Sequence, residues 1–114
     1  MKTRYFLRLP EPATARGTDA DLAFKSEGAA GLAAELQQAL RGTELFDAWR
    51  LRQDEPDEVD ASMGATDPEA TVRGEQHNLA IDLIATTGLP GRIFKHRLRL
   101  LAGSGWELRD VTAG

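Results

Sequence analysis

Hydrophobic and polar positions alternate along residues 79–86. One set of alternate positions is wholly apolar, and the other mixes apolar and polar side chains: Leu79, Ile81, Leu83 and Ala85 against Ala80, Asp82, Ile84 and Thr86. A period of two with branched side chains is typical of a β-strand with one buried face. Because the second set is half apolar, we expect this strand to lie inside its sheet rather than at an edge.

Residues 89–102 fit two patterns. At 100° per residue the apolar side chains fall on one arc, which predicts a helix ending near Gly103: Leu89, Ile93, Phe94, Leu98, Leu100 and Leu101. With a period of two, the same segment reads as a strand from Phe94 to Leu100 followed by a hairpin turn at 102–105. We favour the helix, because Arg, Leu and Lys are good helix formers and basic side chains suit its C-terminal half.

Other segments predict the remaining elements. Strands are expected at 3–9, at 45–53, from Val72 into the central strand with Gly74 as a bulge, and at 106–111, with a short extended segment at 22–25 that pairs back on the first strand. A helix is expected from Ser26, as its N-cap, to Arg41, with Gly42 after it. Its expected buried stripe comprises Ala29, Leu32, Ala33, Leu36, Ala39 and Leu40. Trp49 and Trp106 are expected in the core.

The resulting order is strand, helix, strand, strand, helix, strand. This order predicts an α+β two-layer sandwich of the ferredoxin-like β-α-β-β-α-β kind, with an antiparallel sheet and two helices on one face. A chain of 114 residues has the usual length of one domain, so we expect residues 1–114 to form a single α+β domain with an acidic loop at 54–69.

Composition limits the functional classes. The chain has no cysteine, which excludes disulfides and thiolate chemistry, and no apolar run near the ~20 residues of a membrane span. Its amino terminus is too short and too rich in arginine for a signal peptide, so we expect a cytoplasmic protein. The formal net charge of −4 argues weakly against nonspecific binding of nucleic acid.

Charge is segregated along the chain. Residues 54–69 contain seven carboxylates and no Lys or Arg, whereas residues 88–111 contain five basic side chains against two acidic ones. The acidic run lacks the ligand spacing and the glycine of a Ca²⁺ loop, so we expect no metal there. The candidate binding residues, for an anion or an acidic partner, are Arg92, Lys95, His96, Arg97 and Arg99, together with Asp82.

Arg97 stands out within this basic segment. In the helical interpretation it falls inside the apolar arc, where a guanidinium needs a partner or an interface. Asp82, on the neighbouring strand, is a candidate partner.

Catalytic and cofactor signatures are weak. His77 and His96 are the only histidines, and Asp82 is near both in the sequence, but no serine lies in a nucleophile elbow. The segment after Arg73 and Gly74 lacks the aromatic side chains that an RNA-binding sheet needs for base stacking, and no glycine-rich nucleotide fingerprint is present. We therefore expect no catalytic residue, metal or cofactor.

Three functional hypotheses remain. The first is a non-enzymatic protein-interaction or regulatory module that binds a protein partner or self-associates, motivated by the opposite charges of its two segments. The second is an anion or nucleic-acid binder that uses residues 92–99. The third is a small enzyme that uses His77 or His96 with Asp82. We favour the first.

Overall fold

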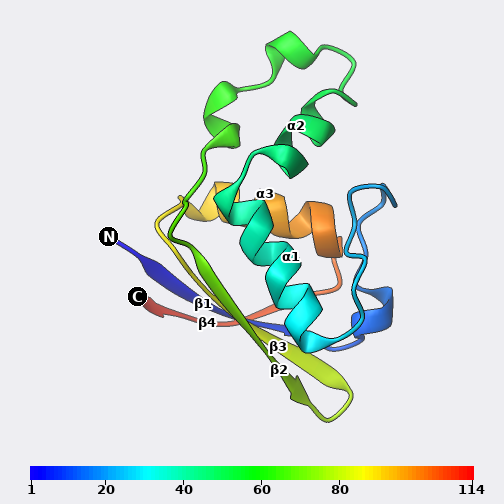
Figure 1. Ribbon diagram of the computed structural model, residues 1–114, viewed down its shortest axis with the longest axis vertical. Coiled ribbons are helices and arrows are strands. Elements are labelled where there is room, and N and C mark those ends of the chain that lie inside the picture. Colours follow the sequence, from blue (N-terminus) through cyan, green and yellow to red (C-terminus); the bar gives the residue numbers. More distant parts are fainter.

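A four-stranded antiparallel sheet forms one layer of the protein, and helices cover one of its faces (Figure 1). The computed structural model describes residues 1–114. Its strands are β1 (Thr3–Leu9), β2 (Thr71–His77), β3 (Ala80–Thr87) and β4 (Glu107–Ala113), in the sheet order β2-β3-β1-β4. Its helices are α1 (Ala29–Arg41), α2 (Glu44–Arg50) and α3 (Gly91–Ala102). Short 3₁₀ turns lie at η1 (Pro12–Thr14), η2 (Pro56–Glu58) and η3 (Ala61–Gly64).

Several predicted elements are confirmed. The first strand spans the predicted residues, and β3 lies in the interior of the sheet between β2 and β1. Residues 91–102 form a helix and not a strand, and Gly103 follows it with a φ of 62°, a backbone conformation that glycine adopts without strain.

The ferredoxin-like prediction is wrong. The predicted strand at 45–53 is largely helix α2, so the chain has three helices, and its element order is β-α-α-β-β-α-β with the sheet order β2-β3-β1-β4. The apolar residues of this segment fit both periods. Spaced three apart, Phe46 and Trp49 lie on one side of a helix, where their ring centroids are 5.8 Å apart.

The segment from Val72 to Thr86 is not one strand but the hairpin of β2 and β3. Asn78 and Leu79 form its turn, and Asn78 has a φ of 56°. Asparagine tolerates this left-handed conformation better than most residues, which explains the turn. The register of β2 with β3 is continuous, so Gly74 is not a bulge.

The start of α1 also differs from the prediction. The helix begins at Ala29 after Gly28, and no side chain caps it. Ser26 instead donates its main-chain N–H to the carboxylate of Glu35 at 2.8 Å. Residues 22–25 do not pair with β1; the main-chain N–H of Phe24 instead donates to the main-chain oxygen of Leu101, in the last turn of α3.

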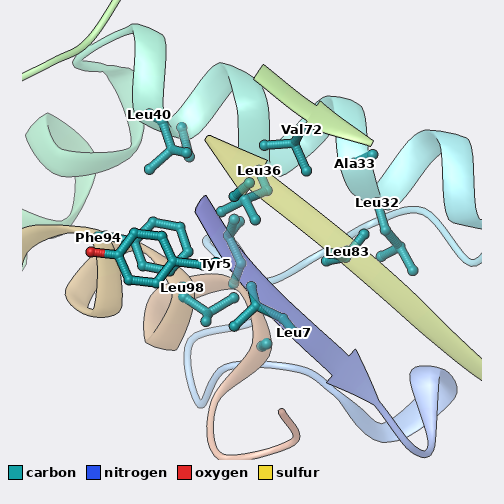
Figure 2. Packing of buried hydrophobic residues seen from close by; sticks show 14 of the residues in the cluster. Tyr5, Leu7, Leu32, Ala33, Leu36, Leu40, Val72, Leu83, Phe94 and Leu98 are labelled. Atoms are coloured by element: carbon teal, nitrogen blue, oxygen red, sulfur yellow. The ribbon is translucent and has the colours of Figure 1, made fainter. Parts of the chain in front are cut away.

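The core lies between the sheet and helices α1 and α3 (Figure 2). The predicted stripe of α1 is confirmed, because all its members are buried except the half-buried Ala29. Across the layers, the rings of Tyr5 and Phe94 stack with their centroids 4.1 Å apart. The prediction that both tryptophans lie in the core is wrong, because Trp49 and Trp106 are only half-buried; Trp106 packs against the core, and Trp49 contacts Phe46 and His96.

Candidate functional site

Arg97 lies entirely inside the protein, although it belongs to the predicted basic binding segment. Its side chain is 0% exposed. Its Nη1 donates to the main-chain oxygen of Ala39 at 2.7 Å, and its Nη2 donates to those of Met63 and Ala65 at 2.9 and 2.6 Å. The guanidinium also lies 5.7 Å from the ring centroid of Phe46 in α2. Its partners are thus main-chain carbonyls and an aromatic ring, and not Asp82.

His96 packs in the same region. Its ring lies at 75° to that of Trp49 with the centroids 4.4 Å apart, and its Nδ1 is buried without a hydrogen-bond partner. Burial lowers the pKa of His96, and the charges of Arg97 and Arg99 lower it further. The imidazole therefore serves as a packing group between α3 and α2.

Of the remaining basic side chains of α3, Arg92 contacts other residues of the chain, whereas no such contact holds Lys95 or Arg99. Arg92 contacts Met63 Sδ at 2.9 Å and the hydroxyl of Ser62 at 3.4 Å, so it also holds the η3 segment. Lys95 is half-buried and Arg99 is exposed. The structure places all five candidates on α3, and three of them fasten α2 and η3 to the helical layer.

Asp82 lies apart from this helix. It belongs to the unburied set of positions on β3, and Arg8 of β1 donates to both of its carboxylate oxygens at 2.7 and 3.0 Å. These bonds from Arg8 lower the pKa of Asp82. Its face of the sheet carries no helix.

The two histidines lie in different layers. His77 is exposed at the end of β2, whereas His96 is on α3. Of the two candidate partners of Asp82, only His77 lies on the strand paired with β3, where His77 pairs with Ala80 and Asp82 with Glu75. No group of three or more His, Asp or Glu side chains is placed to hold a metal ion.

The acidic segment contains one strongly connected carboxylate, Asp67. It accepts hydrogen bonds from the main-chain N–H of Gly88 at 2.8 Å, the hydroxyl of Thr87 at 2.9 Å and the ammonium of Lys2 at 3.3 Å. Its other oxygen accepts from the N–H of Glu69. Burial would raise the pKa of Asp67, but these donors outweigh it and lower the pKa to about 2. Asp67 thus ties the segment before β2 to the end of β3.

Strand β4 is the surface that sequence reasoning missed. It pairs with β1 on one side only and ends the sheet, and all seven of its residues are exposed. Two of the five large hydrophobic residues that are exposed belong to it: Leu108 at 40% and Val111 at 47%. The sequence gives little signal for this, because a strand reveals which edge it occupies only after the sheet order is known.

The opposite edge, along β2, is covered at its start, although most residues of this strand are exposed. The side chain of Gln37 in α1 accepts the main-chain N–H of Val72 in β2 at 3.0 Å. Arg41, also in α1, donates to the oxygen of Ala70 just before β2. These side chains occupy main-chain groups at the start of the β2 edge, so the two edges of the sheet are not equivalent.

No family model, curated protein or solved structure matches the chain. None of the three helices combines the length and the apolar composition required to cross a lipid bilayer.

Proposed function

We propose that the protein is a non-enzymatic interaction module that self-associates. The observation that carries this proposal is the unpaired edge of β4, where seven exposed residues include Leu108 and Val111. An exposed edge strand offers free main-chain donors and acceptors to another strand, and natural sheets normally cover or break such edges. This sheet covers the start of its β2 edge with α1 and leaves β4 open.

The contacts of α3 favour this proposal over the anion-binding alternative. An anion site needs several cations that are free to converge on one ligand. Arg97 and Arg92 instead bind groups of the same chain, and His96 packs against Trp49. Lys95 and Arg99 remain for a ligand, which is a weak basis for phosphate or nucleic-acid binding.

Sedimentation velocity over a concentration series from about 1 to 300 µM tests the proposed function, because an affinity near the micromolar range is typical of a weak specific contact. We expect a monomer at the lowest concentrations and a growing dimer fraction above them. A single monomeric species throughout the series would contradict the proposal. A heparin column run at low salt tests the alternative, and strong salt-sensitive retention would favour it.

A further inference from the structure

Leu108 and Val111 point to the same side of β4, although they are three residues apart. In a regular strand, residues three apart face opposite ways. Here a bulge intervenes: Leu108 pairs with Leu7 and Val111 with Tyr5, and the register shifts between Phe6 and Leu7. Leu7 and Tyr5 both face the core, so Leu108 and Val111 both face the helical side of the sheet. The bulge thereby places two exposed apolar side chains on one face, with Arg109 and Asp110 between them.

We propose that two copies of the chain join by antiparallel pairing of their β4 strands about a two-fold axis that lies between Arg109 and Asp110. Leu108 of each copy then faces Val111 of the other, and Arg109 of each faces Asp110 of the other. The two sheets become one continuous sheet of eight strands. This inference rests on the proposed function and specifies its surface and its partner, which is a second copy.

Residues 108–111 are complementary to themselves, which identifies a second copy of the chain as the partner of the β4 edge. Two-fold symmetry requires that a residue at position i meet position j and that j meet i. The series Leu108, Arg109, Asp110, Val111 satisfies this, because reversing it sets apolar against apolar and base against acid. Cross-strand pairs of these two kinds each stabilise a sheet modestly, and here each kind occurs twice.

One contact within the monomer must be exchanged. The main-chain N–H of Val111 donates to the side chain of its neighbour Asp110 at 2.9 Å, so this N–H does not bond β1. In the dimer the N–H passes to the carbonyl oxygen of Leu108 in the second copy, and the Asp110 carboxylate turns to Arg109 of that copy. Arg109 in the monomer has only an exposed pairing with Glu107 at 3.3 Å, and it is free to make this change.

The bond between the N–H of Val111 and the carboxylate of Asp110 also fits a competing interpretation, in which Asp110 keeps other strands away from the β4 edge. A charged side chain on an edge strand, and a bulge within it, are devices that keep other strands away. If Asp110 only guards the edge, removing its charge promotes association. If Asp110 pairs with Arg109 of a second copy, reversing its charge weakens association.

Charge reversal separates these interpretations. We expect Arg109→Asp and Asp110→Arg each to raise the dimer dissociation constant about tenfold or more, because each sets like charges opposite one another twice. The double variant R109D/D110R restores opposite charges and should return the dissociation constant to within about threefold of the wild type. Arg73→Asp, an exposed charge reversal on β2, is the matched control and should leave it unchanged.

Cysteine cross-linking reports the register directly, because the chain contains no cysteine of its own. The double variant L108C/V111C should form a covalent dimer under mild oxidation, since each new thiol faces its counterpart on the second copy. Leu108→Cys and Val111→Cys alone place identical thiols beyond the ~7 Å Cα separation that a disulfide tolerates, and they should remain monomeric on a denaturing gel.

The outcomes distinguish this inference from the proposed function. If the wild type dimerises but the three charge variants associate equally well, the dimer uses another surface and only the present inference fails. Stronger association of Asp110→Ala than of the wild type would show a guarded edge and would also overturn it, because the proposed pairing with Arg109 predicts weaker association when this charge is removed. If the wild type stays monomeric at every concentration, both fail.

Discussion

Arg97 and Ala39 are 58 positions apart in the chain, yet the Nη1 of Arg97 donates a 2.7 Å hydrogen bond to the main-chain oxygen of Ala39. The Nη2 of the same group donates to Met63 and Ala65. One buried guanidinium therefore joins α3 to α1 and to the end of η3, and no carboxylate bonds to it. Its burial lowers its pKa, which is the cost of this arrangement.

Arg97→Met should destabilise the protein by about 3 kcal/mol or more, because main-chain carbonyls then lose a charged donor inside the protein. Urea unfolding at pH 7 measures the change in free energy of unfolding. Arg99→Met is the matched control on the same helix; Arg99 is exposed, and its loss should change stability by about 0.5 kcal/mol or less. Equal effects of the two substitutions would contradict the structural role of Arg97.

Gly74 allows α1 to lie against β2. A Cβ atom added at this position would meet the main-chain oxygen of Ala29 at 2.2 Å, whereas one added at Gly28 would meet nothing within 4 Å. Gly74→Ala should therefore destabilise the protein by about 1–3 kcal/mol, as overpacking does, and Gly28→Ala should be nearly neutral. Thermal unfolding of the two variants compares them. If Gly74→Ala melts with the wild type, the close approach is not required.

Asp67 links stability to acidic pH. Its pKa is about 2 in the folded protein against an ordinary value of 3.8, so its stabilisation is complete above about pH 4 and is lost as the pH falls toward 2. Asp67→Asn should be less stable than the wild type at pH 7 by about 1–2 kcal/mol, because the charged acceptor is gone. The difference should shrink between pH 4 and pH 2. A stability difference that stays constant over this range, in urea unfolding at several pH values, would argue against it.

His96 makes the stability of the protein depend on pH in the mildly acidic range. Burial lowers its pKa below the ordinary 6.5, so below pH 6.5 the unfolded chain takes up a proton that the folded protein resists, and stability falls. His96→Phe keeps a ring against Trp49 and should lose less stability than the wild type between pH 7.5 and pH 5.5. His77→Phe, at an exposed position, is the control and should follow the wild type. Parallel curves for wild type and His96→Phe would contradict this assignment.

The elements that the sequence predicts correctly include those whose apolar residues fit a single period, either that of a strand or that of a helix. In β1 and β3 one set of alternate positions is buried, and in α1 the apolar positions follow a helical stripe. The segment of α2 predicts a strand as readily as a helix, because Leu45, Trp49 and Leu51 follow a period of two, whereas Phe46 and Trp49 have the spacing of one helix face. The hairpin of β2 and β3 was missed because its two-residue turn lacks the glycine that normally marks one.

The partners of Arg97 could not be predicted from the sequence, for a different reason. The position of Arg97 in an apolar arc correctly indicated that it needs a partner, but every residue has a main-chain carbonyl, so carbonyl acceptors leave no signal in the sequence. Asp82, the expected partner, binds Arg8 instead. Likewise, the sequence shows that residues 92–99 are basic. It does not show which of these side chains are buried, because that depends on how α3 packs against α2 and η3.

Amide hydrogen exchange at low and at high protein concentration tests the proposed β4 dimer most directly. Pairing of two β4 strands bonds main-chain groups that the monomer leaves to solvent or to Asp110. We expect exchange at residues 107–113 to slow as the concentration rises, with the amide of Val111 strongly affected, while exchange in β2 stays the same. Exchange in β4 that is unchanged at a concentration where sedimentation shows a dimer would place the interface elsewhere and contradict the account.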